Sequence, residues 1–245
     1  IVVKKRRHVE KDISDFLEEL VKLFSTQLEV SNVEYQKKLR KKAEFKALQS
    51  QVNPHFLYNA LNTIACICDE DSAKASDLIL TLASYYRQTL ENDQYMLDLD
   101  TEISHIRTYL QIEQARFEEK LRVNIQVEPG LACQVPSFIL QPIVENAVRY
   151  GNGADGVRNV EIIAGRVKDE RGEEQVRIEV RDHGKGFAPG QAEAILSGKA
   201  SGSVGLKNVH ERLRSTYGKR YGLVIRNLEE GAEVSFVVPY QAETV

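Results

Sequence analysis

The first glycine in this chain of 245 residues is Gly130, so more than half of the sequence contains none. Glycine supplies the backbone freedom that tight turns need, and it weakens a helix by about 1 kcal/mol relative to alanine. From Asp12 to about Ile67 apolar residues recur at helical spacing, and helical patterns begin again at "LILTLASYYRQTL" and at Thr101. The sequence therefore predicts a chain that is helical up to Glu119.

The first helical stretch carries an apolar stripe that one helix cannot bury by itself. The stripe consists of Ile13, Phe16, Leu17, Leu20, Phe24 and Leu28, followed later by Phe45, Leu48 and Val52. Polar residues between the two groups make the heptad pattern imperfect. The simplest cover is the same helix of a second copy, so we expect a homodimer. Packing against another segment of the same chain is the alternative.

After Glu119 strand patterns alternate with helical ones, and the glycines gather there. The predicted strands are Leu121–Val127, Val160–Val167, Gln175–Arg181, Tyr221–Asn227 and Glu233–Val238, and the predicted helices are Ser137–Tyr150 and Gly205–Tyr217. This mixture predicts an α+β fold, in which long dimerising helices are followed by an α/β sandwich with a mixed sheet packed on helices.

Composition narrows the class of protein. The chain has 42% hydrophobic residues, 28% charged residues and a net charge of −3. A net charge so close to zero argues against a protein dedicated to binding nucleic acid. The three cysteines lack a useful metal-ligand spacing, and we expect buried thiols. The basic run "KKRR" after Ile1–Val3 is typical of the cytoplasmic side of a membrane span, so we expect a transmembrane or linker segment upstream. A solvated basic helix start is the alternative.

One stretch, "QVNPHFLYNALN", sets Pro54 beside His55 in a helical pattern. Proline inside a helix costs about 3 kcal/mol, which suggests that it opens or bends the helix there for a reason. Helical spacing groups Gln51, His55, Asn59 and Asn62 on a polar stripe, and Val52, Phe56, Ala60, Leu61 and Ile64 on the core face. His55 should therefore be exposed, and a neutral imidazole is a good nucleophile near neutral pH.

Three further motifs follow in order. Glu145 and Asn146 are polar neighbours in an apolar helix and offer oxygen ligands suited to Mg²⁺, or they are simply solvated. Asp182 ends a strand in an Asp-x-Gly-x-Gly motif. The aspartate could accept a hydrogen bond from a ligand amino group, or the motif could form a plain β-turn. The stretch "SGKASGSVGLKNVHERL" is a glycine-rich segment leading into a helix, which suits phosphate binding or an ordinary loop with a capped helix.

In this order the motifs resemble the ATP-binding domain shared by histidine kinases, gyrase-type ATPases and Hsp90-like chaperones. The stretch "QVNPHFLYNALN" resembles that of the LytS-type sensor histidine kinases of bacteria. The resemblance covers about Phe45 to Val238. It implies that His55 accepts a phosphoryl group from ATP and passes it to an aspartate of a response-regulator partner. The general base stays unassigned, with Glu145 as a candidate.

The resemblance also implies a nucleotide site with Mg²⁺. Asn146 would help to hold the metal, and Asp182 would read the adenine amino group. The other expected nucleotide-binding positions are Gly184 and Gly186 at the adenine pocket, Gly202 and Gly205 flanking a lid, and Leu206 and Asn208 in the helix that follows. The sequence departs from the family pattern at Ser203, His183 and Tyr150.

We expect three domains. Residues 1–44 would form a juxtamembrane signalling helix or coiled coil, residues 45–120 a helical dimerisation and phosphoacceptor domain, and residues 121–245 the catalytic ATP-binding domain. The core would then act at the cytoplasmic face of the bacterial membrane. The alternatives are an ATPase or protein serine kinase on the same nucleotide fold, and a non-catalytic dimeric signalling scaffold.

Overall fold

The computed structural model describes residues 26, 27, 31, 35, 37, 54–91, 94–199 and 204–241. The chain divides into two compact units, Ile1–Val52 and Asn53–Val245. In the first unit the five described residues are helical and exposed. The apolar stripe expected from Ile13 to Val52 lies outside the described residues.

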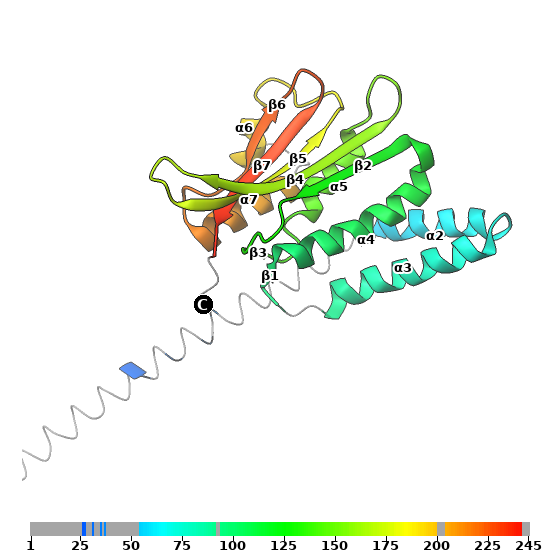
Figure 1. The fold of residues 1–245 in the computed structure, drawn as a ribbon, viewed down its shortest axis with the longest axis horizontal. Coiled ribbons are helices and arrows are strands. Elements are labelled where there is room, and N and C mark those ends of the chain that lie inside the picture. The colour runs from blue at the N-terminus through cyan, green and yellow to red at the C-terminus, as the bar shows by residue number, and fades with distance from the viewer. Residues whose placement is uncertain are drawn as a thin grey trace, which may run out of the picture. The chain divides into compact units, whose positions relative to one another are not determined.

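The second unit begins with helices. Helix α2 spans Pro54–Cys68, α3 spans Ser72–Glu91 and α4 spans Leu99–Phe117, followed by the short turn η1 at Glu118–Lys120. Helices α2 and α3 form a hairpin that packs on α4 (Figure 1). The prediction of helix up to Glu119 is confirmed for these segments.

A short strand corrects that prediction. Strand β1, Met96–Asp98, stands between α3 and α4 and pairs antiparallel with β3, Gln134–Pro136. Three residues are too few for a recognisable strand pattern, and the partner is distant in the sequence. The pairing ties the start of α4 to the segment that leads into α5.

The main sheet has five strands in the order β2, β4, β5, β7, β6. They are β2 (Leu121–Val127), β4 (Arg158–Lys168), β5 (Glu174–Asp182), β6 (Val224–Asn227) and β7 (Ala232–Pro239). Strand β2 runs parallel to β4, and the other neighbours are antiparallel, so the sheet is mixed. All five predicted strands are present, although the last-but-one starts three residues later than Tyr221. The α+β fold class is confirmed.

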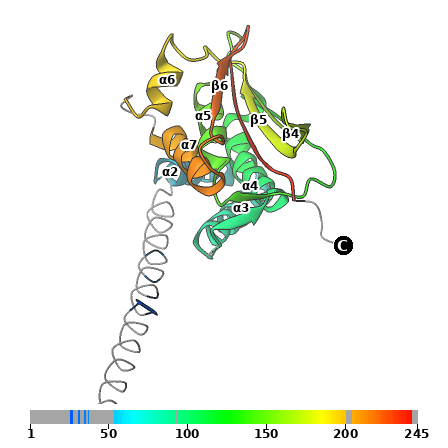
Figure 2. The same cartoon turned by 90° about the vertical axis from the view of Figure 1, so that its left-hand side faces the viewer.

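Helices α5 (Gln141–Tyr150), α6 (Gln191–Leu196) and α7 (Val204–Tyr217) lie on one side of this sheet (Figure 2). Helix α6 has only six residues and was not predicted.

Helix α5 begins four residues after Ser137, the predicted start of this helix. Phe138 has a positive φ of 58°, and the Glu102 carboxylate of α4 accepts hydrogen bonds from the backbone N–H groups of Phe138 and Leu140, each at 3.0 Å.

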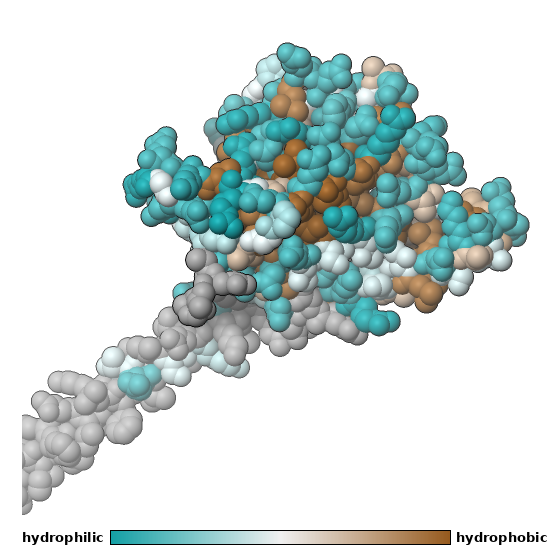
Figure 3. Space-filling model, viewed as in Figure 1, coloured by the Kyte–Doolittle hydropathy of each residue, from teal (hydrophilic) through white to brown (hydrophobic). Residues whose placement is uncertain are grey.

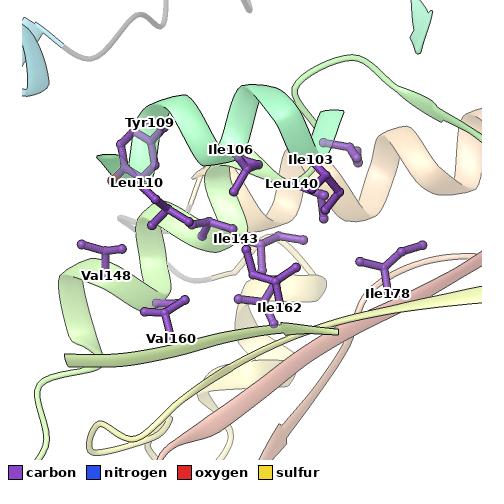
Figure 4. Close-up of a cluster of buried hydrophobic side chains, with 14 of the residues drawn as sticks. Ile103, Ile106, Tyr109, Leu110, Leu140, Ile143, Val148, Val160, Ile162 and Ile178 are labelled. Carbon is purple, nitrogen blue, oxygen red and sulfur yellow. The ribbon is translucent and has the colours of Figure 1, made fainter. Parts of the chain in front are cut away.

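Helix α4 shares one hydrophobic core with α5 and the sheet. Ile106 and Leu110 of α4 point toward Ile143 of α5, and Val160 and Ile162 of β4 lie beneath them (Figure 4). All five side chains are buried. Helix α4 is therefore held on one side by the α2–α3 hairpin and on the other by the helices and sheet that follow it.

The surface corrects two expectations. Cys66 and Cys68 are exposed, and only Cys133 is buried. Leu61, expected on the core face of α2, is 48% exposed, and hydrophobic residues show on the surface formed by α2 and α3 (Figure 3).

Among the described residues, no helix combines the length and the hydropathy that a membrane crossing requires.

Candidate functional site

The position of His55 follows from the residue after it in the chain. The described part of α2 begins at Pro54, next to His55. Phe56 is only 4% exposed, and its ring packs on Tyr85 of α3 and Tyr109 of α4, with centroids 5.0 and 5.1 Å away. Burial of Phe56 directs the adjacent His55 outward, and the predicted exposure of His55 is confirmed.

Asn59 lies one helical turn beyond His55 on the same polar stripe. Its Nδ2 atom is 3.1 Å from Nδ1 of His55. An amide beside one ring nitrogen orients the imidazole. Whether the amide presents its NH₂ group or its oxygen to that nitrogen also influences which ring nitrogen carries the proton. The predicted polar stripe therefore includes a contact that positions His55.

A cleft of about 340 Å³ opens beside His55. Helix α2 contributes His55 and Asn59, α5 contributes Glu145 and Asn146, and the start of α7 contributes Gly205 and Leu206. Five predicted site residues, His55, Glu145, Asn146, Gly205 and Leu206, thus line one cleft. These residues lie up to 151 positions apart in the sequence.

Two acidic side chains in this cleft have raised pKa values. Burial raises the pKa of the Glu145 carboxyl, whose Oε1 atom accepts a hydrogen bond from Gln141 Nε2 at 2.9 Å. Burial also raises the pKa of Glu113 on α4, with the charge of Glu145 as a further cause, although Arg116 opposes it from 3.4 Å. A carboxyl group whose pKa is raised toward neutrality is better matched to proton transfer than an ordinary one.

Glu113 was not among the predicted site residues, although the sequence contains a signal for it. Apolar residues at Ile106, Tyr109 and Leu110 define the buried stripe of α4, and Glu113 continues that stripe at helical spacing. A carboxylate is almost never fully buried without a partner or a function. Glu113 is 4% exposed, so the break in the stripe marks the wall of the cleft.

A second cleft, of about 590 Å³, contains Asp182 and Gly186. Asp182 ends β5 and is 6% exposed, its Oδ1 atom accepts a hydrogen bond from the N–H of Gly184 at 2.9 Å, and burial raises the pKa of its carboxyl. A side chain at Gly184 would collide with the Tyr150 carbonyl oxygen, and Gly186 has a positive φ of 68°. Gly186 lines the cleft, whereas Gly184 packs behind Asp182.

The two clefts share a wall. Asn146, Arg149 and Tyr150 from α5, with Arg158 from β4, line both. A molecule anchored at Asp182 can therefore extend past Asn146 toward His55. Tyr150 belongs to this wall, so its departure from the family pattern falls directly at the site.

The remaining predicted residues lie elsewhere. Asn208 is on α7 but lines neither cleft, and His183 also lines neither. Gly202 and Ser203 lie outside the described residues. Arg149 and Arg158 were not predicted as site residues, because neither stands in a distinctive local sequence pattern. They lie on two separate elements, and only the tertiary fold brings them to the clefts.

The donor set suits a sparsely held magnesium ion. In the described parts of the chain no three or more His, Cys, Asp or Glu side chains gather as a metal-binding cluster. Asn146 offers one amide oxygen at the junction of the clefts, beside the Glu145 carboxyl. Mg²⁺ commonly binds through one or two protein oxygens with substrate phosphates and water completing its shell, so the residues present fit such an ion.

Comparisons with known proteins place this chain among related sequences. A family model described as histidine kinase matches residues 43–121, and one described as histidine kinase-, DNA gyrase B-, and HSP90-like ATPase matches residues 136–242. The chain is 40% identical over 233 residues to the sensor protein LytS of Bacillus cereus, and 40% identical over 228 residues to the sensor histidine kinase YpdA of Escherichia coli K12.

Each of these two alignments covers 92% of this chain and 39% of the relative, so the chain spans about two fifths of the length of the curated relatives it matches. Among solved structures, the chain is similar to the catalytic domain of the histidine kinase ThkA, with a TM-score of 0.47 and 16% identity. That match covers 59% of this chain and 94% of the ThkA domain.

Proposed function

The chain belongs to the family of sensor histidine kinases that includes the LytS proteins, and from this membership we propose that it is an ATP-dependent histidine kinase core that phosphorylates its own His55. The observation that carries the proposal is the shared wall of the two clefts. Asn146 lines the cleft that contains Asp182 and also the cleft that contains His55. This arrangement gives ATP a place to bind and its terminal phosphate a path to the histidine.

Asp182 would anchor the nucleotide. Its carboxylate accepts a hydrogen bond from the adenine amino group while Gly184 holds the other side of the aspartate in place. Asn146 and Arg149 would then meet the phosphates at the junction of the clefts. Bound Mg²⁺, held in part by Asn146, would neutralise charge on the phosphate oxygens.

His55 would carry out the transfer. A ring nitrogen of His55 forms the bond to the γ-phosphorus as the bond from that phosphorus to the bridging oxygen breaks, and ADP leaves with the electron pair. The ring proton passes to a carboxylate in the cleft, for which Glu145 is the proposed acceptor because burial raises its pKa. Most of the acceleration comes from positioning and charge neutralisation, as in other phosphoryl transfers.

Partners and domain roles belong to the same proposal. Residues 1–44 would be the signalling helix, residues 45–120 the dimerisation and phosphoacceptor domain, and residues 121–245 the catalytic domain. Exposed Tyr58, Leu61, Ile79 and Leu80 on α2 and α3 support a homodimer, because a second copy would bury them. The phosphoryl group would pass to an aspartate of a response regulator, with the core at the cytoplasmic face of the bacterial membrane.

The chemistry of the label tests this proposal. After incubation with labelled Mg-ATP, a phosphohistidine is lost in acid and survives alkali. A label that is stable in acid and lost in alkali would instead indicate a protein serine kinase on the same nucleotide fold. Absence of Mg-ATP binding in calorimetry would indicate a non-catalytic scaffold.

A further inference from the structure

Arg158 is held at the junction of the two clefts by contacts from two helices. It is the first residue of β4, and its Nε atom donates a hydrogen bond to the Val148 carbonyl of α5 at 3.1 Å. Its guanidinium carbon lies 4.3 Å from the centre of the Phe117 ring at the end of α4. These contacts restrict the guanidinium to one place although the side chain is only partly buried.

The charge of Arg158 interacts with that of Glu113, but the two side chains form no ion pair. Arg116 contacts the same Phe117 ring at 4.6 Å, but it forms an ion pair with the buried Glu113 at 3.4 Å. Among the described residues no carboxylate forms an ion pair with Arg158. The hydrogen bond to Val148 uses one of the five N–H donors of the guanidinium, which leaves a planar pair of nitrogens suited to phosphate.

We propose that Arg158 contacts the γ-phosphoryl group while it moves from ATP to His55. This inference rests on the proposed function and adds a residue to it. Arg158 lines both the cleft that contains Asp182 and the cleft that contains His55, which is the place that the transferring group must cross. Phe117 and the Val148 carbonyl position the guanidinium for that contact.

The contact would act on charge that the reaction creates. As the His55 nitrogen forms its bond to phosphorus and the bond to ADP breaks, negative charge is spread over the three oxygens of the phosphoryl group and the departing ADP oxygen. A guanidinium donates two parallel hydrogen bonds to such oxygens. Arginines in this role raise the rate of phosphoryl transfer by about 10³-fold or more.

The strand that carries Arg158 also supplies a matched control. Arg166 lies further along β4, its guanidinium is 4.0 Å from the centre of the Tyr240 ring, and it lines neither cleft. Arg158→Gln and Arg166→Gln therefore remove the same charge and the same type of ring contact from one strand. Arg158→Lys keeps the positive charge but loses the planar pair of donors.

The test measures the rate of His55 labelling at saturating Mg-ATP and the affinity for ADP in the 245-residue chain and these variants. We expect Arg158→Gln to slow labelling by about 10³-fold, with ADP affinity changed by less than about threefold, because ADP lacks the γ-phosphoryl group. Arg158→Lys should recover part of the rate, and Arg166→Gln should match the unmodified chain in both measurements.

Three outcomes would overturn the inference. Labelling of Arg158→Gln at the unmodified rate would remove Arg158 from the transfer. An equal loss in ADP affinity and in labelling rate would show that Arg158 only maintains the shape of the pocket. Failure of free guanidinium ion to restore labelling to a folded Arg158→Ala variant would lead to the same conclusion. No labelling of the unmodified chain would instead contradict the proposed function itself.

Discussion

The ring of Phe56 packs against the ring of Tyr109 with their centroids 5.1 Å apart, which ties the residue after His55 to the helix that leads into the sheet. Tyr109 also lines the cleft beside His55. The anchor of helix α2 and the wall of the cleft are therefore parts of one aromatic cluster. A change in this cluster should alter both stability and the position of His55.

Phe56→Ala should destabilise the protein by about 3–5 kcal/mol, because it removes a buried aromatic ring and leaves a cavity. Phe56→Leu keeps most of the apolar volume and should lose less stability while still slowing His55 labelling. Urea denaturation measures the first effect and labelling in folded protein measures the second. Equal labelling rates in Phe56→Leu and the unmodified chain would contradict a positioning role for Phe56.

Asp182→Asn should weaken ATP binding by about 1.5–3 kcal/mol, because the adenine amino group loses a charged acceptor. Asp169→Asn is a suitable control. Asp169 also accepts backbone hydrogen bonds, from the N–H groups of Arg171 and Glu173, but it lines neither cleft. Calorimetry should detect weaker binding only in the Asp182 variant, and unchanged affinity there would remove the adenine assignment.

Glu145 should make stability depend on pH. Burial raises the pKa of its carboxyl, so the folded protein keeps this proton at pH values where the unfolded chain has lost it. Its contribution is fully present below the ordinary pKa of glutamate and is lost as the pH rises through the raised folded-state pKa. Glu145→Gln cannot ionise, and its side-chain oxygen can still accept the hydrogen bond from Gln141.

We therefore expect Glu145→Gln to gain stability relative to the unmodified chain as the pH rises from about 4 to about 8, with little difference at the acidic end. Thermal denaturation at several pH values measures this difference. A stability difference that stays constant over the whole range would show that the pKa of Glu145 is not raised by folding.

Leu61→Glu and Leu80→Glu should convert a dimer into monomers. Leu61 is 48% exposed and Leu80 66% exposed in the single chain, so a charge there should leave the folded monomer intact while opposing burial against a second copy. Light scattering measures the molecular mass over a range of concentrations. Unchanged dimers in both variants would place the dimer interface outside α2 and α3.

Local patterns in the sequence predicted most elements of the second unit, because alternating and helical periodicities are properties of short segments. The motif around His55 also showed which neighbour is buried and which is exposed. Leu61 was assigned to the core wrongly, because helical spacing defines a face but not how far the packing partner extends over it. In α2 that partner covers Phe56 and Ala60 but not Leu61.

Contacts between distant segments could not be predicted in this way. Strand β1 exists because Met96–Asp98 pairs with Gln134–Pro136. Helix α5 starts later than predicted because the Glu102 carboxylate accepts hydrogen bonds from backbone N–H groups just before the helix. The shared wall of the clefts is of the same kind, since Asn146 and Arg158 come from different elements. Each motif was visible alone, but their arrangement depends on the tertiary fold.

The most direct test of the central claim compares the unmodified chain with His55→Gln after incubation with labelled Mg-ATP. Glutamine has a similar shape and polarity, and Phe56 should still anchor the helix, so ATP affinity should be unchanged. We predict one phosphoryl group per unmodified chain, lost in acid and stable in alkali, and none on the His55→Gln variant. A strong acid-labile label that persists in His55→Gln would show that His55 is not the nucleophile.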